Sequence, residues 1–81
     1  MISTYMKVLI QDGRNKKFFT ADHEWVNDVR AGQDFASHRE AFAMAQQTNA
    51  AEFNIVLYSA SGRYAFKVDQ GKSAHANHTD N

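Results

Sequence analysis

Four stretches of the chain are predicted to be β-strands, and apolar and polar residues alternate most clearly in the first and the third. The predicted strands cover residues 4–11, 16–22, 53–59 and 63–68. Successive side chains of a strand point to opposite faces, so residues two apart share a face. In the first stretch Met6, Val8 and Ile10 therefore share one face, while Leu9 points to the other. The turn residues Asp12-Gly13-Arg14-Asn15 join the first two stretches into a predicted hairpin.

A helix signal follows the first two predicted strands. Ser37 stands three residues before Glu40, which is the spacing of a capping box. The apolar residues that follow have helical spacing, and they predict a helix from Ser37 to about Asn49. Residues 23–36 show no clear period. We interpret them as an ordered loop whose Trp25 and Phe35 cover the edge of the core.

The element order β-β-α-β-β predicts an α+β fold with a four-stranded, mainly antiparallel sheet and one helix on one face. We predict the sheet order 2-1-3-4, with the strands numbered along the chain, because this order makes all neighbouring strands antiparallel. It also places the strands that carry Lys16, Lys17 and Lys67 at the edges, where lysine discourages aggregation. The shared core is predicted to contain Val8, Phe42, Ile55 and Leu57.

Large apolar residues end at Val68, and this sets the predicted domain boundary. The 81 residues are expected to form one domain over 1–69, followed by a disordered tail over 70–81. No apolar run approaches the ~18 residues of a membrane span, and the N-terminus is typical of a first strand rather than a signal peptide. The chain has no cysteine. These features favour a cytoplasmic protein without membrane contact.

Few residues have the spacing that catalysis or metal binding requires. The chain lacks a glycine-rich phosphate loop and a nucleophile set beside a base. Asp22-His23-Glu24 is interpreted as a solvated loop start, because neighbouring side chains at a strand end point in different directions. His75 and His78 have no third ligand nearby, whereas zinc usually takes four ligands. The sequence therefore predicts a protein that is not an enzyme, with no cofactor, metal or small-molecule site.

One short helix is too small to cover both faces of a four-stranded sheet, so we expect the other face to be open. Leu9, Val56 and Tyr58 point to that face and form a candidate protein interface. A mixed solvated face is the alternative interpretation. Trp25 is either cover for the core or a contact residue. The leading hypothesis is a non-catalytic protein-interaction or regulatory module that acts through this face, through the Trp25 loop or by self-association as a dimer.

Basic residues at the tip of the first hairpin support an alternative function. Arg14, Lys16 and Lys17 lie near Phe18 and Phe19, and basic residues beside aromatic rings bind single-stranded nucleic acid by phosphate contact and base stacking. Nine basic residues balance nine acidic ones, so the whole chain has no net attraction for nucleic acid. The alternative is therefore a weak nucleic-acid-binding module, and the non-functional interpretation is a solvated tip with edge-protecting lysines.

The segment from Trp25 to Phe35, followed by Glu40-Ala41, Ala45 and the strand IVLY, resembles short uncharacterised bacterial proteins. In those proteins an extended hairpin leads to a Trp/Ala/Phe loop and then to an alanine-rich helix. The likeness covers roughly residues 5 to 60 and is a packing pattern with no chemical motif. It implies a bacterial source and no catalytic activity.

Overall fold

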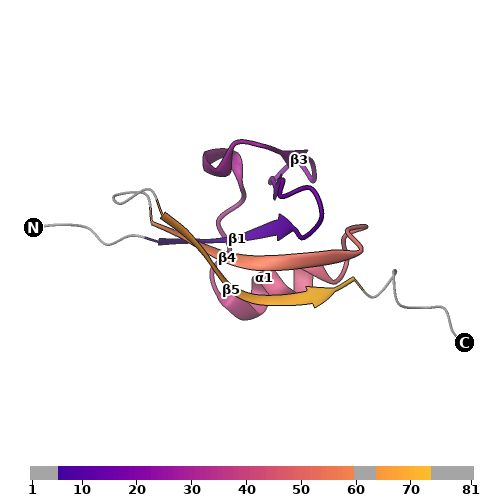
Figure 1. The fold of residues 1–81 in the computed structure, drawn as a ribbon. Helices are drawn as coiled ribbons and strands as arrows, with labels where there is room; N and C mark the ends of the chain where they lie inside the picture. The colour runs from indigo at the N-terminus through magenta and orange to yellow at the C-terminus, as the bar shows by residue number, and fades with distance from the viewer. Residues whose placement is uncertain (1–5, 60–63, 74–81) are drawn as a thin grey trace, which may run out of the picture.

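The computed structural model describes residues 6–59 and 64–73, and within these ranges the fold is α+β, with one α-helix and a five-stranded antiparallel sheet. The strands are β1 (Met6–Asp12), β2 (Phe18–Phe19), β3 (Trp25–Val26), β4 (Glu52–Ser59) and β5 (Tyr64–Lys72). The 3-10 helix η1 (Val29–Ala31) and the α-helix α1 (His38–Ala45) lie between β3 and β4 in the chain. Figure 1 shows α1 on one side of the sheet and the segment with β3 and η1 on the other.

The sheet has five strands, whereas the sequence predicts four. The additional strand β3 pairs with β2, so the order β3-β2-β1-β4-β5 differs from the predicted four-stranded order. A tight turn makes this pairing possible, because the Thr20 hydroxyl accepts hydrogen bonds from the amides of Asp22 and Glu24, and His23 has a φ of 64°. Two paired residues are too few to produce a visible alternation, which is why the sequence analysis missed β3.

Helix α1 begins where the sequence predicts. The Ser37 hydroxyl accepts a hydrogen bond of 3.1 Å from the amide of Glu40, and Ala41 and Ala45 are buried. The helix ends at Ala45 rather than near Asn49, because the hydroxyl of Thr48 donates a hydrogen bond of 2.7 Å to the Ala45 carbonyl. The chain thus leaves the helix in a turn and enters β4.

We expect Ser37→Ala to lower the free energy of unfolding by about 1 kcal/mol, because the substitution leaves the Glu40 amide without its cap. Chemical denaturation measures this loss. Arg39→Ala is the control, since Arg39 is exposed in the same helical turn; we expect its effect to stay within about 0.5 kcal/mol. An unchanged stability of the Ser37 variant would contradict the role of this cap.

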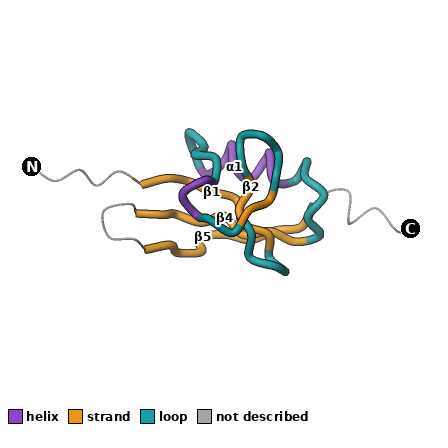
Figure 2. The backbone as a smooth tube through the Cα atoms, turned by 90° about the horizontal axis from the view of Figure 1, so that it is seen from above, coloured by secondary structure: helices purple, strands orange, loops and turns teal. Residues whose placement is uncertain are grey.

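Two apolar clusters lie on opposite faces of the sheet. The first lies between α1 and the sheet and contains Ile10, Phe19, Phe35, Ala41, Ala45, Phe53 and Ile55. The second contains Leu9, Phe18, Val56 and Tyr58, and Val29 of η1 packs against it. Figure 2, viewed from above, shows the segment with η1 lying over the strands. Val8, Phe42 and Leu57 of the predicted core are all partly buried. Val8 and Phe42 pack against the first cluster, whereas Leu57 does not belong to it.

On the face opposite α1, the part around Leu9, Val56 and Tyr58 is therefore covered, and the predicted open patch there is wrong. Leu9 is 0%, Val56 is 3% and Tyr58 is 8% exposed. The loop that was expected at the edge of the core instead crosses this face. Its backbone approaches closely at Gly32, where a Cβ atom would lie 3.2 Å from Cδ2 of Leu9. Buried side chains of this kind stabilise the fold and do not form a contact surface.

Strand β5 continues to Lys72, past the predicted domain boundary at residue 69. Backbone pairing with β4 holds this polar end, since Glu52 lies opposite Lys72 and Phe53 lies opposite Gly71. The next residue, Ser73, is fully buried and donates a hydrogen bond of 2.7 Å to the Thr48 carbonyl. The rest of the predicted tail, with His75 and His78, and the predicted turn at 60–62 lie outside the described residues.

Candidate functional site

Trp25 covers the edge of the first apolar cluster. Its side chain is partly buried, and its ring centroid lies 5.1 Å from that of Phe19. The imidazole of His23 stacks on the same Phe19 ring, with 5.4 Å between centroids. Phe19 belongs to β2, and His23 belongs to the tight turn between β2 and β3. Trp25 thus contributes to packing on one side and presents the remaining part of its ring to solvent.

The basic hairpin tip lacks the aromatic surface that the nucleic-acid hypothesis requires. Phe18 is 8% and Phe19 is 4% exposed, and each ring belongs to a different apolar cluster. Neither ring is free to stack on a base. Arg14 and Lys16 are exposed and Lys17 is partly buried, so the basic residues of the tip do lie at the surface. The prediction that these basic residues and the two phenylalanine rings together form a nucleic-acid-binding surface is therefore wrong.

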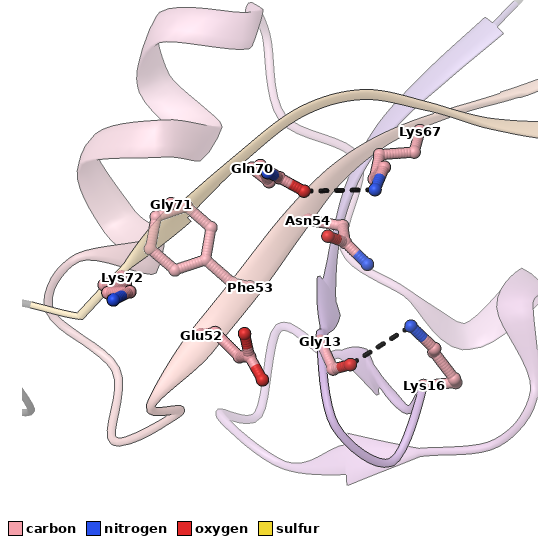
Figure 3. Close-up of a pocket in the computed structure, with 9 residues that line it drawn as sticks. All are labelled: Gly13, Lys16, Glu52, Phe53, Asn54, Lys67, Gln70, Gly71 and Lys72. Atoms are coloured by element: carbon pink, nitrogen blue, oxygen red, sulfur yellow. Dashed lines mark hydrogen bonds between the residues drawn. The ribbon is translucent and has the colours of Figure 1, made fainter.

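Next to this tip the structure has a shallow pocket of about 360 Å³ between the β1–β2 turn and β5 (Figure 3). Its lining residues come from the turn, from the start of β4 and from β5: Gly13, Lys16, Glu52, Phe53, Asn54, Lys67, Gln70, Gly71 and Lys72. Of the three basic tip residues singled out from the sequence, only Lys16 is among them. The other cationic groups, Lys67 and Lys72, come from β5.

A β-bulge at Val68 brings Gln70 to the same face of β5 as Lys67. Val56 pairs with Lys67 and Ile55 pairs with Asp69, so Val68 is an extra residue in β5. A bulge of this kind shifts the alternation of the strand and re-aims the following side chains. Lys67 and Gln70 consequently lie close enough for the ammonium group to donate a hydrogen bond of 3.0 Å to the Gln70 side-chain oxygen.

The β1–β2 turn holds Lys16 beside the pocket. The Asp12 carboxylate accepts hydrogen bonds from the amides of Arg14, at 2.7 Å, and Asn15, at 3.3 Å. Lys16 itself has a φ of 65°, in the left-handed region that reverses the chain direction. Its ammonium group folds back and donates a hydrogen bond of 3.1 Å to the Gly13 carbonyl. The side chain thus stays over the turn, as Figure 3 shows.

The charge of the pocket is mainly positive, with three lysines against Glu52. Lys72 is the cross-strand partner of Glu52, so their opposite charges offset each other at that end of the pocket. The ion pairs found among residues 6–59 and 64–73 lie elsewhere, between Asp28 and Arg30 and between His38 and Asp69. Lys16 and Lys67 therefore form no ion pair with a carboxylate among the described residues.

A polar contact on the other face of the sheet joins α1 to β5. The imidazole Nε2 of His38 lies 2.7 Å from Oδ2 of Asp69. The amide of Gln70 and then the His38 side chain hold the pKa of Asp69 below its ordinary value, because both donate hydrogen bonds to the carboxylate. Both side chains are solvent-accessible, so we interpret the pair as a structural link. Within the described ranges no three residues of the metal-ligating types gather at one point.

One end of the sheet carries exposed apolar side chains beyond the reach of α1. Leu57 lies opposite Phe66 on β5, and these two residues share the face that α1 covers further along the strands. Met6 is 37% and Phe66 is 48% exposed. We call Met6, Leu57 and Phe66 the apolar end. Figure 1 shows the strands extending past α1 toward the start of β1.

Neither the pocket nor the apolar end is predicted from the sequence. The sequence predicts Phe66 in the last strand and Leu57 in the core. A sequence signal for exposed apolar residues does exist: Phe66 and Val68 add large apolar side chains to a sheet that one short helix is too small to cover. No sequence signal marks the bulge that builds the pocket.

Comparison with protein-family models, with curated proteins and with solved structures finds no match. The resemblance to short bacterial proteins therefore stays a prediction. Across residues 6–59 and 64–73, no helix has the length and apolar character needed to cross a membrane. Functional inference for this chain accordingly rests on the geometry of the apolar end and of the basic pocket.

Proposed function

We propose that this protein is a small non-catalytic protein-interaction module and that its contact surface is the apolar end. The observation that carries the proposal is the exposure of Phe66, at 48%, next to the partly buried Leu57. A singly exposed apolar side chain is ordinary, but a group of them at one end of a sheet marks an interaction surface. Val68, the bulge residue of the same strand, is also 48% exposed.

Strand β5 forms the outer edge of the sheet, with β4 as its neighbour, and it is nine residues long. An edge strand of this length offers backbone groups to a partner strand. The bulge at Val68 interrupts that regular edge, and bulges of this kind discourage strand addition. We therefore place the contact on the side chains of the apolar end rather than on the backbone of β5.

The partner that we propose is a second copy of the chain. The apolar end consists of uncharged side chains, so a two-fold axis can bring the same surface of both copies together without repulsion between like charges. Phe66 is the anchor, because a large exposed ring loses the most solvent contact when it is covered. A surface of so few side chains predicts a weak dimer whose population depends on concentration.

Replacing Phe66 with serine is expected to abolish self-association. Sedimentation velocity over a range of protein concentrations should show the unmodified protein moving from monomer to dimer, whereas the Phe66→Ser variant stays monomeric. The physical reason is the loss of the largest exposed apolar side chain of the apolar end. The fold of the variant is verified by circular dichroism, and it is expected to persist because Phe66 is exposed in the monomer.

The matched control for this experiment is Lys72→Ser, a substitution of an exposed residue at the opposite end of the same strand. This variant should dimerise like the unmodified protein. An unmodified protein that remains monomeric at the highest attainable concentration contradicts the proposal. Equal loss of association in the two variants contradicts it as well, because the contact would then not lie at the apolar end.

A further inference from the structure

We propose that the pocket between the β1–β2 turn and β5 binds the phosphate group of a small ligand. This site is independent of self-association, because its charged side chains lie on the face of the sheet opposite the apolar end. The register places Lys67 beside Val56, which belongs to the cluster under η1. Leu57 of the apolar end instead lies two residues after Ile55 in β4, and it therefore shares the face of the cluster under α1.

Two ammonium groups from distant parts of the chain supply the positive charge. Lys16 donates one hydrogen bond to the Gly13 carbonyl at 3.1 Å, and Lys67 donates one to the Gln70 side chain at 3.0 Å. An ammonium group carries three N–H donors, so each lysine retains two for a ligand. The partners that hold them are neutral, and the positive charge of both groups is therefore available to an anion.

A buried amide side chain lies between these two lysines. Asn54 is 7% exposed, and Figure 3 shows its side chain between those of Lys16 and Lys67. It donates one hydrogen bond of 3.0 Å to the Gln11 side-chain oxygen, which sets the orientation of the amide. The second N–H of this amide is an additional donor for a ligand. Because the surroundings hold Asn54 in place, it needs little ordering when a ligand binds.

The chemistry of the pocket favours a single phosphate group over an extended nucleic acid. A phosphate monoester carries close to two negative charges and three acceptor oxygens, which match two ammonium groups and one amide. Phe53, the aromatic residue of the lining, is 1% exposed and offers no surface for a base. Arg14 and Lys17 do not line the pocket, so the cations are concentrated in it rather than spread along a strand-binding track.

The negative charge of Glu52 in the same pocket repels an anion, so removing this charge should change phosphate affinity in the direction opposite to the loss of a lysine. Its carboxylate lines the pocket, and its charge is offset in part by its cross-strand partner Lys72. Replacing Glu52 with glutamine removes the negative charge and keeps the shape of the side chain. The Glu52→Gln variant should therefore bind phosphate more tightly than the unmodified protein, whereas loss of a lysine weakens binding.

The test is a titration of the isotopically labelled protein with inorganic phosphate, followed by amide NMR, with chloride keeping the ionic strength constant. We expect saturable shifts at Gly13, Asn54 and Gln70. Lys67→Gln and Lys16→Gln should each weaken phosphate binding about tenfold, since each removes charge-assisted hydrogen bonds. Lys17→Gln is the matched control, because it makes the same charge change in the same hairpin outside the pocket, and it should leave binding unchanged.

Shifts that fail to saturate, or an equal effect of Lys17→Gln, would overturn the proposal, because the interaction would then be general charge attraction. Binding of a single-stranded oligonucleotide without binding of inorganic phosphate would also overturn it and would assign the basic tip to nucleic acid. The Phe66→Ser variant should bind phosphate like the unmodified protein. Failure of the dimer and failure of the phosphate site are therefore separate outcomes.

Discussion

Replacing Leu9 with alanine is expected to lower the free energy of unfolding by about 2–5 kcal/mol. Leu9 is fully buried in the cluster under η1, and the backbone of Gly32 approaches it so closely that the surrounding chain has little freedom to fill a cavity. Such a loss is a large fraction of the stability of any domain of this size, which is typically about 5–15 kcal/mol. Urea denaturation followed by circular dichroism measures the change.

The control for Leu9→Ala is Leu57→Ala, which removes the same atoms from the neighbouring strand β4. Leu57 is partly buried and belongs to the apolar end, so its loss should cost clearly less than that of Leu9. Equal costs would mean that the two sides of the sheet are covered to the same extent. A near-native Leu9 variant would mean that the segment with η1 does not pack against the sheet.

The burial of Leu9 was not predictable from the sequence, whereas features set by neighbouring residues were. The Ser37 cap and the coarse α+β class depend on residues close together in the chain, and both are confirmed. The coverage of Leu9 depends on a long-range contact instead. Val29 is the residue of η1 that packs there, and it stands among polar residues that show no helical or strand period. Periodicity cannot reveal a segment that packs through one side chain.

The basic pocket was predictable only in part, for a related reason. The sequence identified Lys16 as a member of a basic hairpin tip, since turn residues and cations are visible in the chain itself. The contribution of Gln70 depends on the bulge at Val68. A strict alternation places residues three apart on opposite faces. Only the shift in register brings Lys67 and Gln70 into contact beside Lys16.

The same bulge affects both surfaces that we assign to function. It interrupts the outer edge of β5, which turns the proposed self-association away from strand addition and toward the side chains of the apolar end. It also brings Gln70 to the face on which Lys67 lines the pocket. The strand thus presents Phe66 on one face and both Lys67 and Gln70 on the other.

Gly71 lies on the same strand, and Gly71→Ala is expected to lower the free energy of unfolding by about 1–3 kcal/mol. A Cβ atom at this position would lie 2.8 Å from Cζ of Phe53 and 2.9 Å from Cζ of Phe42. These two rings pack edge to face with 5.2 Å between their centroids, and Phe53 is 1% exposed. The Phe53 ring is enclosed by the core, so the added methyl group displaces β5 or the Phe42 side chain of α1. Gly71 has no positive φ, so the effect is steric.

Urea denaturation measures the loss, and near-UV circular dichroism reports the packing of the two rings. Gly13→Ala is the control, because a Cβ atom there would meet first Cγ of Glu52, at 3.0 Å, in an exposed and flexible side chain. We expect this control to change stability by less than the Gly71 variant. An unaltered Gly71→Ala protein would show that β5 ends before Gly71, as the sequence predicts from the absence of large apolar residues. A destabilised one would show that the polar end of β5 is part of the folded domain, because only a strand pressed against Phe42 and Phe53 excludes a methyl group.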